Sequence, residues 1–215
     1  MNNPSFKIIF KTQNHVVFFE INKENNIDAD VEVFSSVSDL PSANIIVRSK
    51  INEISELEKI ENNQRIEIQY FYDEHMEVAF KGIISSVEDQ KKGINLVLNI
   101  KCISEFIELF SYIPNILDNE KSFKEIIENI INEKKIDGEI IFHQNIAIKN
   151  KLFYCRKIPI LAIMNNFARI NDLSIIFHAN SIIEITKRQS LYEDSMGEIY
   201  HIGEDEIIKI KKIIQ

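Results

Sequence analysis

Apolar and polar residues alternate with a period of two through most of the first hundred positions. The clearest run places five apolar residues at alternate positions: Ile94, Leu96, Leu98, Ile100 and Cys102. Shorter runs of the same kind begin at Phe6, Val17, Val31, Ile45 and Ile66. Such alternation predicts strands with one buried and one wetter face. Many short antiparallel strands favour a closed barrel or a sandwich, since closure removes exposed edges. We therefore predict an antiparallel β-barrel over residues 1–103.

Two segments within this region have a less regular pattern. Residues 53–60 are compatible with a short helix or with an irregular crossover. Gln90 to Gly93 is a turn signal that joins a predicted strand at 78–87 to the last strand, as a hairpin.

The apolar spacing changes at Ser104, where helical periodicity begins. A short helix is expected around 106–110, ending before Pro114. The next helix has the strongest signal, because Ser122 and Glu125 form a capping box. An apolar stripe follows at helical spacing: Phe123, Ile126, Ile127, Ile130 and Ile131. The pattern then predicts a strand over 139–142.

A further helix is expected to begin near Pro159, where the missing N–H costs nothing. It is followed by a hairpin of strands 174–177 and 181–185. We predict an α+β chain whose second domain, 104–187, is a smaller α/β domain with two helices and short strands. Residues 188–215 form a C-terminal linker and extension. Its last part, 207–214, mixes isoleucines with lysines and fits a strand or a helix.

Composition excludes several classes of function. The chain has 215 residues, 25 Lys+Arg and 33 Asp+Glu, and a net charge of −8. This charge opposes nonspecific nucleic-acid binding, which depends on basic residues at phosphates. The five glycines form neither GxGxxG nor a P-loop. No apolar run approaches the roughly 18 residues of a membrane span, so we expect a soluble protein without an integral membrane segment.

The candidate reactive residues fit structural roles better than catalytic ones. No histidine pair has metal-ligand spacing, and Cys102 falls on the apolar face of its strand. Asp73-Glu74-His75 and His178 fall in predicted turns. Cys155 precedes Arg156 and Lys157, and basic neighbours lower a thiol pKa, but the residue fits better as a small strand residue that precedes a helix. We predict no catalytic, cofactor-binding or metal-binding residues, and no enzyme activity.

The order of motifs resembles that of phage baseplate hub proteins. Phe80-Lys-Gly82-Ile-Ile84 is similar to the F-x-G-x-I stretch in the tail-tube-like barrel of that family. Lys157-Ile-Pro159 resembles the Lys-x-Pro start of a helix that a small hairpin follows. The resemblance covers roughly residues 1–187. A glycine within a strand also indicates a bend or a bulge on physical grounds.

This resemblance implies a non-enzymatic structural component of a tail baseplate, in a contractile-tail phage, a prophage, a tailocin or a related secretion device. Such a virion protein forms a hub ring that joins the tail tube to the central spike and has no cofactor. Such a protein binds further copies of itself, as a trimer or hexamer, and it also binds the tube and spike proteins. DNA passes through the acidic lumen of the ring without specific binding. The implied locations are the tail, and the host cytoplasm during assembly. Residues 188–215 are too few for the second barrel of full-length hubs, so that barrel would lie on another chain or be missing.

Two other classes stay open. An acidic immunity protein that neutralises a basic toxin fits the size and charge, and complementary charge would accelerate binding. A hydrolase with a hidden site would require convergent carboxylates and histidine in a deep pocket.

Overall fold

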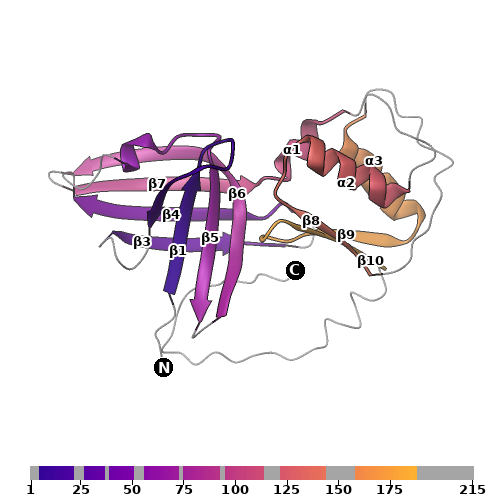
Figure 1. The fold of residues 1–215 in the computed structure, drawn as a ribbon, viewed down its shortest axis with the longest axis horizontal. Coiled ribbons are helices and arrows are strands. Elements are labelled where there is room, and N and C mark those ends of the chain that lie inside the picture. The colour runs from indigo at the N-terminus through magenta and orange to yellow at the C-terminus, as the bar shows by residue number, and fades with distance from the viewer. Residues whose placement is uncertain are drawn as a thin grey trace. The chain divides into compact units, whose positions relative to one another are not determined.

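The computed structural model describes residues 5–21, 27–36, 39–50, 56–72, 75–92, 95–113, 122–143 and 158–187. The chain divides between Glu105 and Phe106 into two compact units (Figure 1). The N-terminal unit is almost entirely β-sheet, and the C-terminal unit combines helices with a small sheet.

The N-terminal unit contains one seven-stranded antiparallel sheet in the order β2-β1-β5-β6-β7-β4-β3. Its strands are β1 (Ser5–Lys11), β2 (Val17–Ile21), β3 (Asp28–Phe34), β4 (Ser42–Lys50), β5 (Arg65–Tyr72), β6 (His75–Lys92) and β7 (Asn95–Ser104), with the short 3-10 turn η2 (Leu57–Lys59) before β5. Within the described residues, β2 and β3 are the two edges and do not pair with each other. The prediction of a closed barrel is therefore wrong. Antiparallel strands formed as the alternation predicts, but the sheet stays open.

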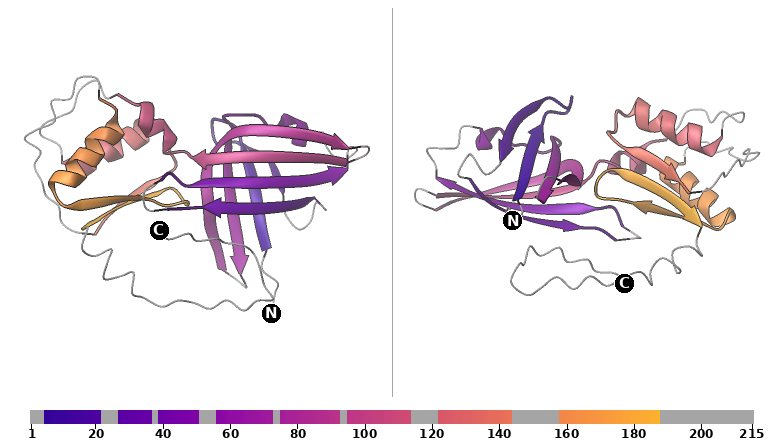
Figure 2. Two further views of the ribbon diagram at one scale, coloured as in Figure 1. Left: turned by 180° about the vertical axis from the view of Figure 1, so that it is seen from behind. Right: turned by 60° about the horizontal axis from the view of Figure 1, so that its bottom comes forward.

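Strand β6 bends the sheet into two layers. Its first half pairs with β5, from His75 to Ile83, and its second half pairs with β7, from Gly82 to Lys92. Strands β1 and β5 consequently run across the direction of β4 and β7, as the views in Figure 2 show. A register shift between Ile84 and Ser86 marks the bend. Such bulges and small residues let one strand turn a corner between crossed layers.

The core lies between these two layers. The β1–β5–β6 side contributes Ile8, Phe10, Ile66, Ile68 and Phe80, and the β4–β7 side contributes Ala43, Ile45, Val47, Leu98 and Ile100. All of these side chains are buried, at alternate positions of their strands. The alternation thus correctly predicted which side chains of these strands point into the core. Strand β6 is longer than the predicted 78–87, and the turn residues Asp73, Glu74 and Gly93 lie outside the described residues.

The C-terminal unit packs three helices beside a three-stranded sheet in the order β8-β10-β9. Its elements are α1 (Ile107–Ser111), α2 (Phe123–Glu133), β8 (Glu139–Phe142), α3 (Ile160–Ile170), β9 (Leu173–Phe177) and β10 (Ile182–Lys187). The capping box of Ser122 and Glu125 is present, and the predicted stripe of α2 is buried. The stacked rings of Phe123 and Phe167 join α2 to α3, with centroids 3.8 Å apart. No described helix is long and apolar enough to cross a membrane.

Gly82 is required at the corner of β6. A Cβ atom on this residue would overlap the carbonyl oxygen of Ile103 and the ring of Phe80. We predict that Gly82→Ala lowers the free energy of unfolding by about 2–3 kcal/mol, because the backbone of β7 must move away. Chemical denaturation measures this loss, and exposed Glu88→Ala on the same strand serves as the control. Equal stability of Gly82→Ala and Glu88→Ala would contradict the close packing described.

Cys102 is buried on the core face of β7, as the alternation predicts. Burial raises the pKa of its thiol from the ordinary 9.0 to about 12. The unfolded state therefore releases this proton first, so the contribution to stability is full below pH 9 and is lost as the pH rises toward 12. In a Cys155→Ser chain, we expect no labelling by a thiol reagent at pH 8 until denaturant is added. Rapid labelling of the native protein would show that the β7 face is open.

Candidate assembly surface

The motif residues Phe80, Gly82 and Ile84 meet at the corner of β6. The side chains of Phe80 and Ile84 are fully buried. The backbone of Ile84 bonds to the segment before β5, where Asn63 N–H donates to Ile84 O at 2.8 Å and Ile84 N–H donates to Gln64 O at 2.9 Å. This segment turns through Asn63, whose φ of 67° is left-handed. The motif thus positions the two layers and offers no reactive group.

The second motif lies at the start of α3. Pro159 is the residue before the first helical position, in an extended conformation, and Lys157 lies outside the described residues. Ile160 N–H donates to Tyr112 O at 2.8 Å, which joins the start of α3 to the residue after α1. Pro159 therefore begins the helix as expected, and it serves packing within the C-terminal unit.

A buried ion pair lies beside the corner of β6 and links the strands on its two sides. The guanidinium of Arg65 bonds to the carboxylate of Glu105, and both side chains are at most 10% exposed. Arg65 opposes Ile83 in the register, and Glu105 follows Ser104, which opposes Gly82. The pair consequently joins the start of β5 to the end of β7 across β6. Removing one member of such a pair leaves an uncompensated buried charge.

A second polar cluster lies on the outer face of β1 and β5. The ammonium of Lys11 is 2.5 Å from a carboxylate oxygen of Glu67, and the amide of Gln69 donates to the other oxygen at 2.6 Å. Burial opposes ionisation of Glu67, but these hydrogen bonds outweigh it and lower the pKa of the carboxyl. Its stabilising contribution is thus present above the ordinary carboxyl pKa and is lost as the pH falls through the lowered value.

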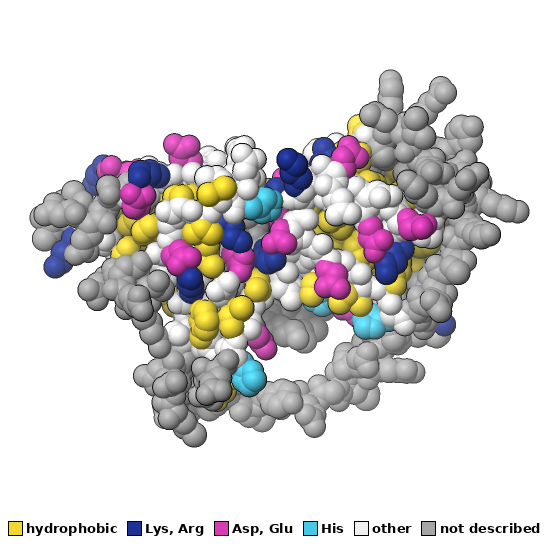
Figure 3. Space-filling view, in the orientation of Figure 1, with side chains coloured by type: hydrophobic (Ala, Val, Ile, Leu, Met, Phe, Trp, Pro, Cys, Tyr) yellow, Lys and Arg dark blue, Asp and Glu magenta, His cyan; other side chains and the backbone are white. Residues whose placement is uncertain are grey.

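Several large apolar side chains of the N-terminal unit face solvent. Tyr72 and Met76 flank the end of the β5–β6 hairpin and are 57% and 51% exposed. Val16 and Val17 are similarly exposed at the start of β2. Figure 3 shows apolar patches interrupted by charged side chains over this unit. Contiguous exposed apolar patches mark surfaces that a partner covers, and an open sheet edge is a template for a further strand.

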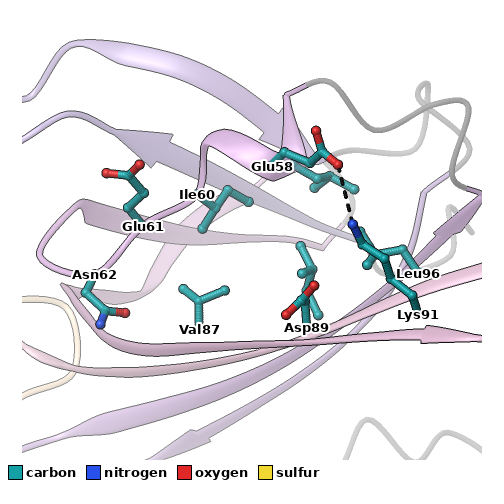
Figure 4. Close-up of a pocket in the computed structure, with 10 residues that line it drawn as sticks. Glu58, Ile60, Glu61, Asn62, Val87, Asp89, Lys91 and Leu96 are labelled. Atoms are coloured by element: carbon teal, nitrogen blue, oxygen red, sulfur yellow. Dashed lines mark ion pairs between the residues drawn. The ribbon is translucent and has the colours of Figure 1, made fainter.

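A pocket of about 500 Å³ opens between η2 and the second half of β6. Ile60 and Val87 face it from opposite walls, and Leu96 and Leu98 add apolar surface (Figure 4). Glu58 and Asp89 stand at its rim, where Lys91 is 3.8 Å from Glu58. The pocket has no histidine or cysteine in its lining, and the rim charges are paired or solvated.

Among the described residues, the group that most resembles a reactive cluster lies on the small sheet of the C-terminal unit. Glu184 on the central strand β10 binds His143, which follows β8, at 2.8 Å, and His178, which follows β9, at 2.6 Å. One carboxylate thus bridges the ends of both neighbouring strands. The sequence predicts His178 in a turn and gives no signal for the cluster. His143 lies 35 positions before His178 and 41 before Glu184, and the six-residue separation of His178 and Glu184 matches no metal-ligand spacing. No group of His, Cys, Asp or Glu in the described ranges has the geometry of a metal site.

Comparison with known proteins identifies the fold. Neither a family model nor a curated protein sequence matches the chain. Among solved structures, the 43 kDa tail protein of prophage MuSo2 from Shewanella oneidensis aligns over 86% of this chain, with a TM-score of 0.59 and 9% identity. The tail protein from Neisseria meningitidis MC58 aligns over 84%, with a TM-score of 0.54 and 10% identity. This chain has the fold of phage tail proteins.

Two further similarities agree with this conclusion. Prophage tail protein gp18 from Listeria monocytogenes EGD-e aligns over 86% of the chain, with a TM-score of 0.51 and 7% identity. A chain of the Francisella PdpA-VgrG complex aligns over 89%, with a TM-score of 0.54 and 10% identity. The present chain spans about half of the three tail proteins, at 53%, 50% and 51% of their lengths. The resemblance drawn from the motif order is confirmed at the level of the fold.

Substitution of the buried Arg65–Glu105 pair tests its contribution to the stability of the β6 corner. We predict that Glu105→Gln lowers the free energy of unfolding by about 3 kcal/mol, because Arg65 keeps its charge in a buried position. Arg48→Gln is the matched control, since Arg48 pairs with Asp28 and Asp30 on the exposed face, where ion pairs contribute little. Chemical denaturation of both variants at one pH compares the two pairs. An equal effect of the two substitutions would show that the Arg65–Glu105 pair is not a clamp.

Proposed function

We propose that this protein is a non-enzymatic structural subunit of a phage or phage-like tail baseplate, where it forms a hub ring that joins the tail tube to the central spike. The observation that carries the proposal is the fold shared with three tail proteins over 84–86% of this chain. Both units contribute to that overlap, so the likeness is not limited to a common β-sheet. It favours a tail role over the alternative of an acidic immunity protein.

The surfaces of the N-terminal unit agree with a role in assembly. In the part of the chain that the structure describes, two sheet edges are open and Tyr72 and Met76 are exposed, and these features offer contacts to other subunits. Rings form when one patch binds a different patch on the next copy and the rotation closes. We therefore expect self-association as a trimer or hexamer, with tube and spike proteins as neighbours and with the virion tail as the location.

The net charge of −8 agrees with passage of DNA through such a ring. An acidic lumen repels phosphates and keeps the DNA from binding. The proposal accordingly includes no specific nucleic-acid binding, and no cofactor is required for a structural role of this kind.

Light scattering and electron microscopy of the purified full chain, alone and with its candidate tube and spike proteins, test the ring. We predict a trimeric or hexameric particle with a central hole. For the variant Tyr72→Asp/Met76→Asp, we expect the dissociation constant of this particle to rise at least tenfold, since charges would enter an apolar contact. The free energy of unfolding of the subunit should change by only about 0.5 kcal/mol.

The matched control is Gln90→Asp/Asn95→Asp, which adds the same charges near the end of the β6–β7 hairpin. A monomer in the presence of every candidate partner would contradict the hub proposal. A ring that both double variants disrupt equally would retain the hub but remove Tyr72 and Met76 from its contacts.

A further inference from the structure

Two charged side chains of β6 lie on the same face of the sheet as the core. Asp89 is directly opposite Leu98 in the pairing of β6 with β7, and Lys91 is directly opposite Leu96. Side chains that oppose each other in an antiparallel pair share a face, and both leucines are at most 4% exposed. The alternation would therefore place apolar residues at positions 89 and 91. A carboxylate and an ammonium occur there instead, and both are exposed in the pocket beside η2.

The wall of this pocket that faces β6 is held in place by hydrogen bonds. The side chain of Gln64 donates to Lys59 O at 2.9 Å and accepts from the N–H of Glu61 at 2.9 Å. The backbone bonds of Ile84 to Asn63 and Gln64 then attach this segment to β6. A wall that is fixed before binding loses little conformational freedom when a ligand enters. The volume of about 500 Å³ also lies in the range typical of ligand sites.

The interior of the pocket is apolar. Val87 on β6 faces Ile60 across it (Figure 4). Four lining side chains are at most 5% exposed and form a closely packed floor: Leu57, Ile60, Leu96 and Leu98. The pocket can therefore cover an aliphatic chain that enters from solvent.

The rim of the pocket carries three carboxylates and one ammonium. The ammonium of Lys91 is 3.8 Å from the carboxylate of Glu58, and the two side chains are 58% and 64% exposed, so this pair contributes little. Within the described ranges, no basic side chain lies at ion-pair distance from the carboxylates of Glu61 and Asp89. The rim thus has an excess of negative charge, which complements a cationic ligand.

We propose that this pocket is the docking site for an arginine side chain of a partner protein. An arginine buries its alkyl stem along apolar surface while its guanidinium stays at a polar rim. The stem would lie between Ile60 and Val87, and the guanidinium would meet Glu61 and Asp89. The planar guanidinium has five donors and is only weakly hydrated, which favours it over a lysine ammonium at a rim with two available carboxylates. This inference does not depend on the hub role proposed above.

Methyl NMR of the full chain, titrated with the peptide acetyl-Gly-Leu-Arg-Leu-Gly-amide, tests the docking site. We expect the peptide to shift methyl signals of the pocket, those of Ile60, Val87, Leu96 and Leu98. The same peptide with citrulline in place of arginine retains the shape of the side chain but has no charge. Its dissociation constant should be at least about tenfold higher, because the acidic rim then has no cation to attract.

Two double variants locate the site. Glu61→Gln/Asp89→Asn should raise the dissociation constant of the arginine peptide at least about fivefold. The matched control is Glu32→Gln/Glu88→Gln, which also removes two negative charges, from exposed positions on β3 and on the opposite face of β6, and should leave the affinity unchanged.

Four results would overturn the proposal. The pocket methyl signals could remain unshifted by the arginine peptide, the citrulline peptide could bind as tightly, or the two double variants could weaken binding equally. Finally, n-butylguanidinium could bind as tightly as the peptide, which would show that the pocket takes free small cations and does not recognise a protein segment.

Discussion

The bend of β6 is the constraint on which the N-terminal unit depends. One continuous strand provides pairing partners for both layers, so a core can form between them without a separate connection. The bend is possible because Gly82 has no side chain between Phe80 and the carbonyl of Ile103. Phe80 and Ile84 then point into the core from either side of the glycine. The motif that carries the family resemblance is thus the element that sets the crossing of the layers.

The charged side chains around this bend form ion pairs that connect different strands. Arg65 and Glu105 join the two strands that β6 separates, and Lys11 with Gln69 satisfies Glu67 on the adjacent outer face. Buried charges cost free energy unless they are paired and hydrogen-bonded, and here they are both. Their pairing therefore restricts which strands can meet at the corner. Apolar packing alone would allow the two layers to cross at more than one angle.

The sequence predicted the local elements well because their signals are local. The capping box of Ser122, the stripe of α2 and the hairpin after α3 all depend on neighbours within a few residues. The predicted barrel failed because closure depends on pairing between β2 and β3, which are distant in the sheet and carry no sequence signal for each other. The clamp of Arg65 with Glu105, 40 positions apart, was missed for the same reason.

The two open edges differ, and this difference bears on what each one contacts. Strand β3 exposes an acidic row, which discourages pairing with another copy of the same acidic edge. Strand β2 begins with the exposed Val17 and has only Glu20 as a charged residue, which is bound to Lys7 at 2.8 Å. An apolar edge of this kind resists association much less. Contacts between copies are consequently more favourable at β2, together with the neighbouring Val16, than at β3.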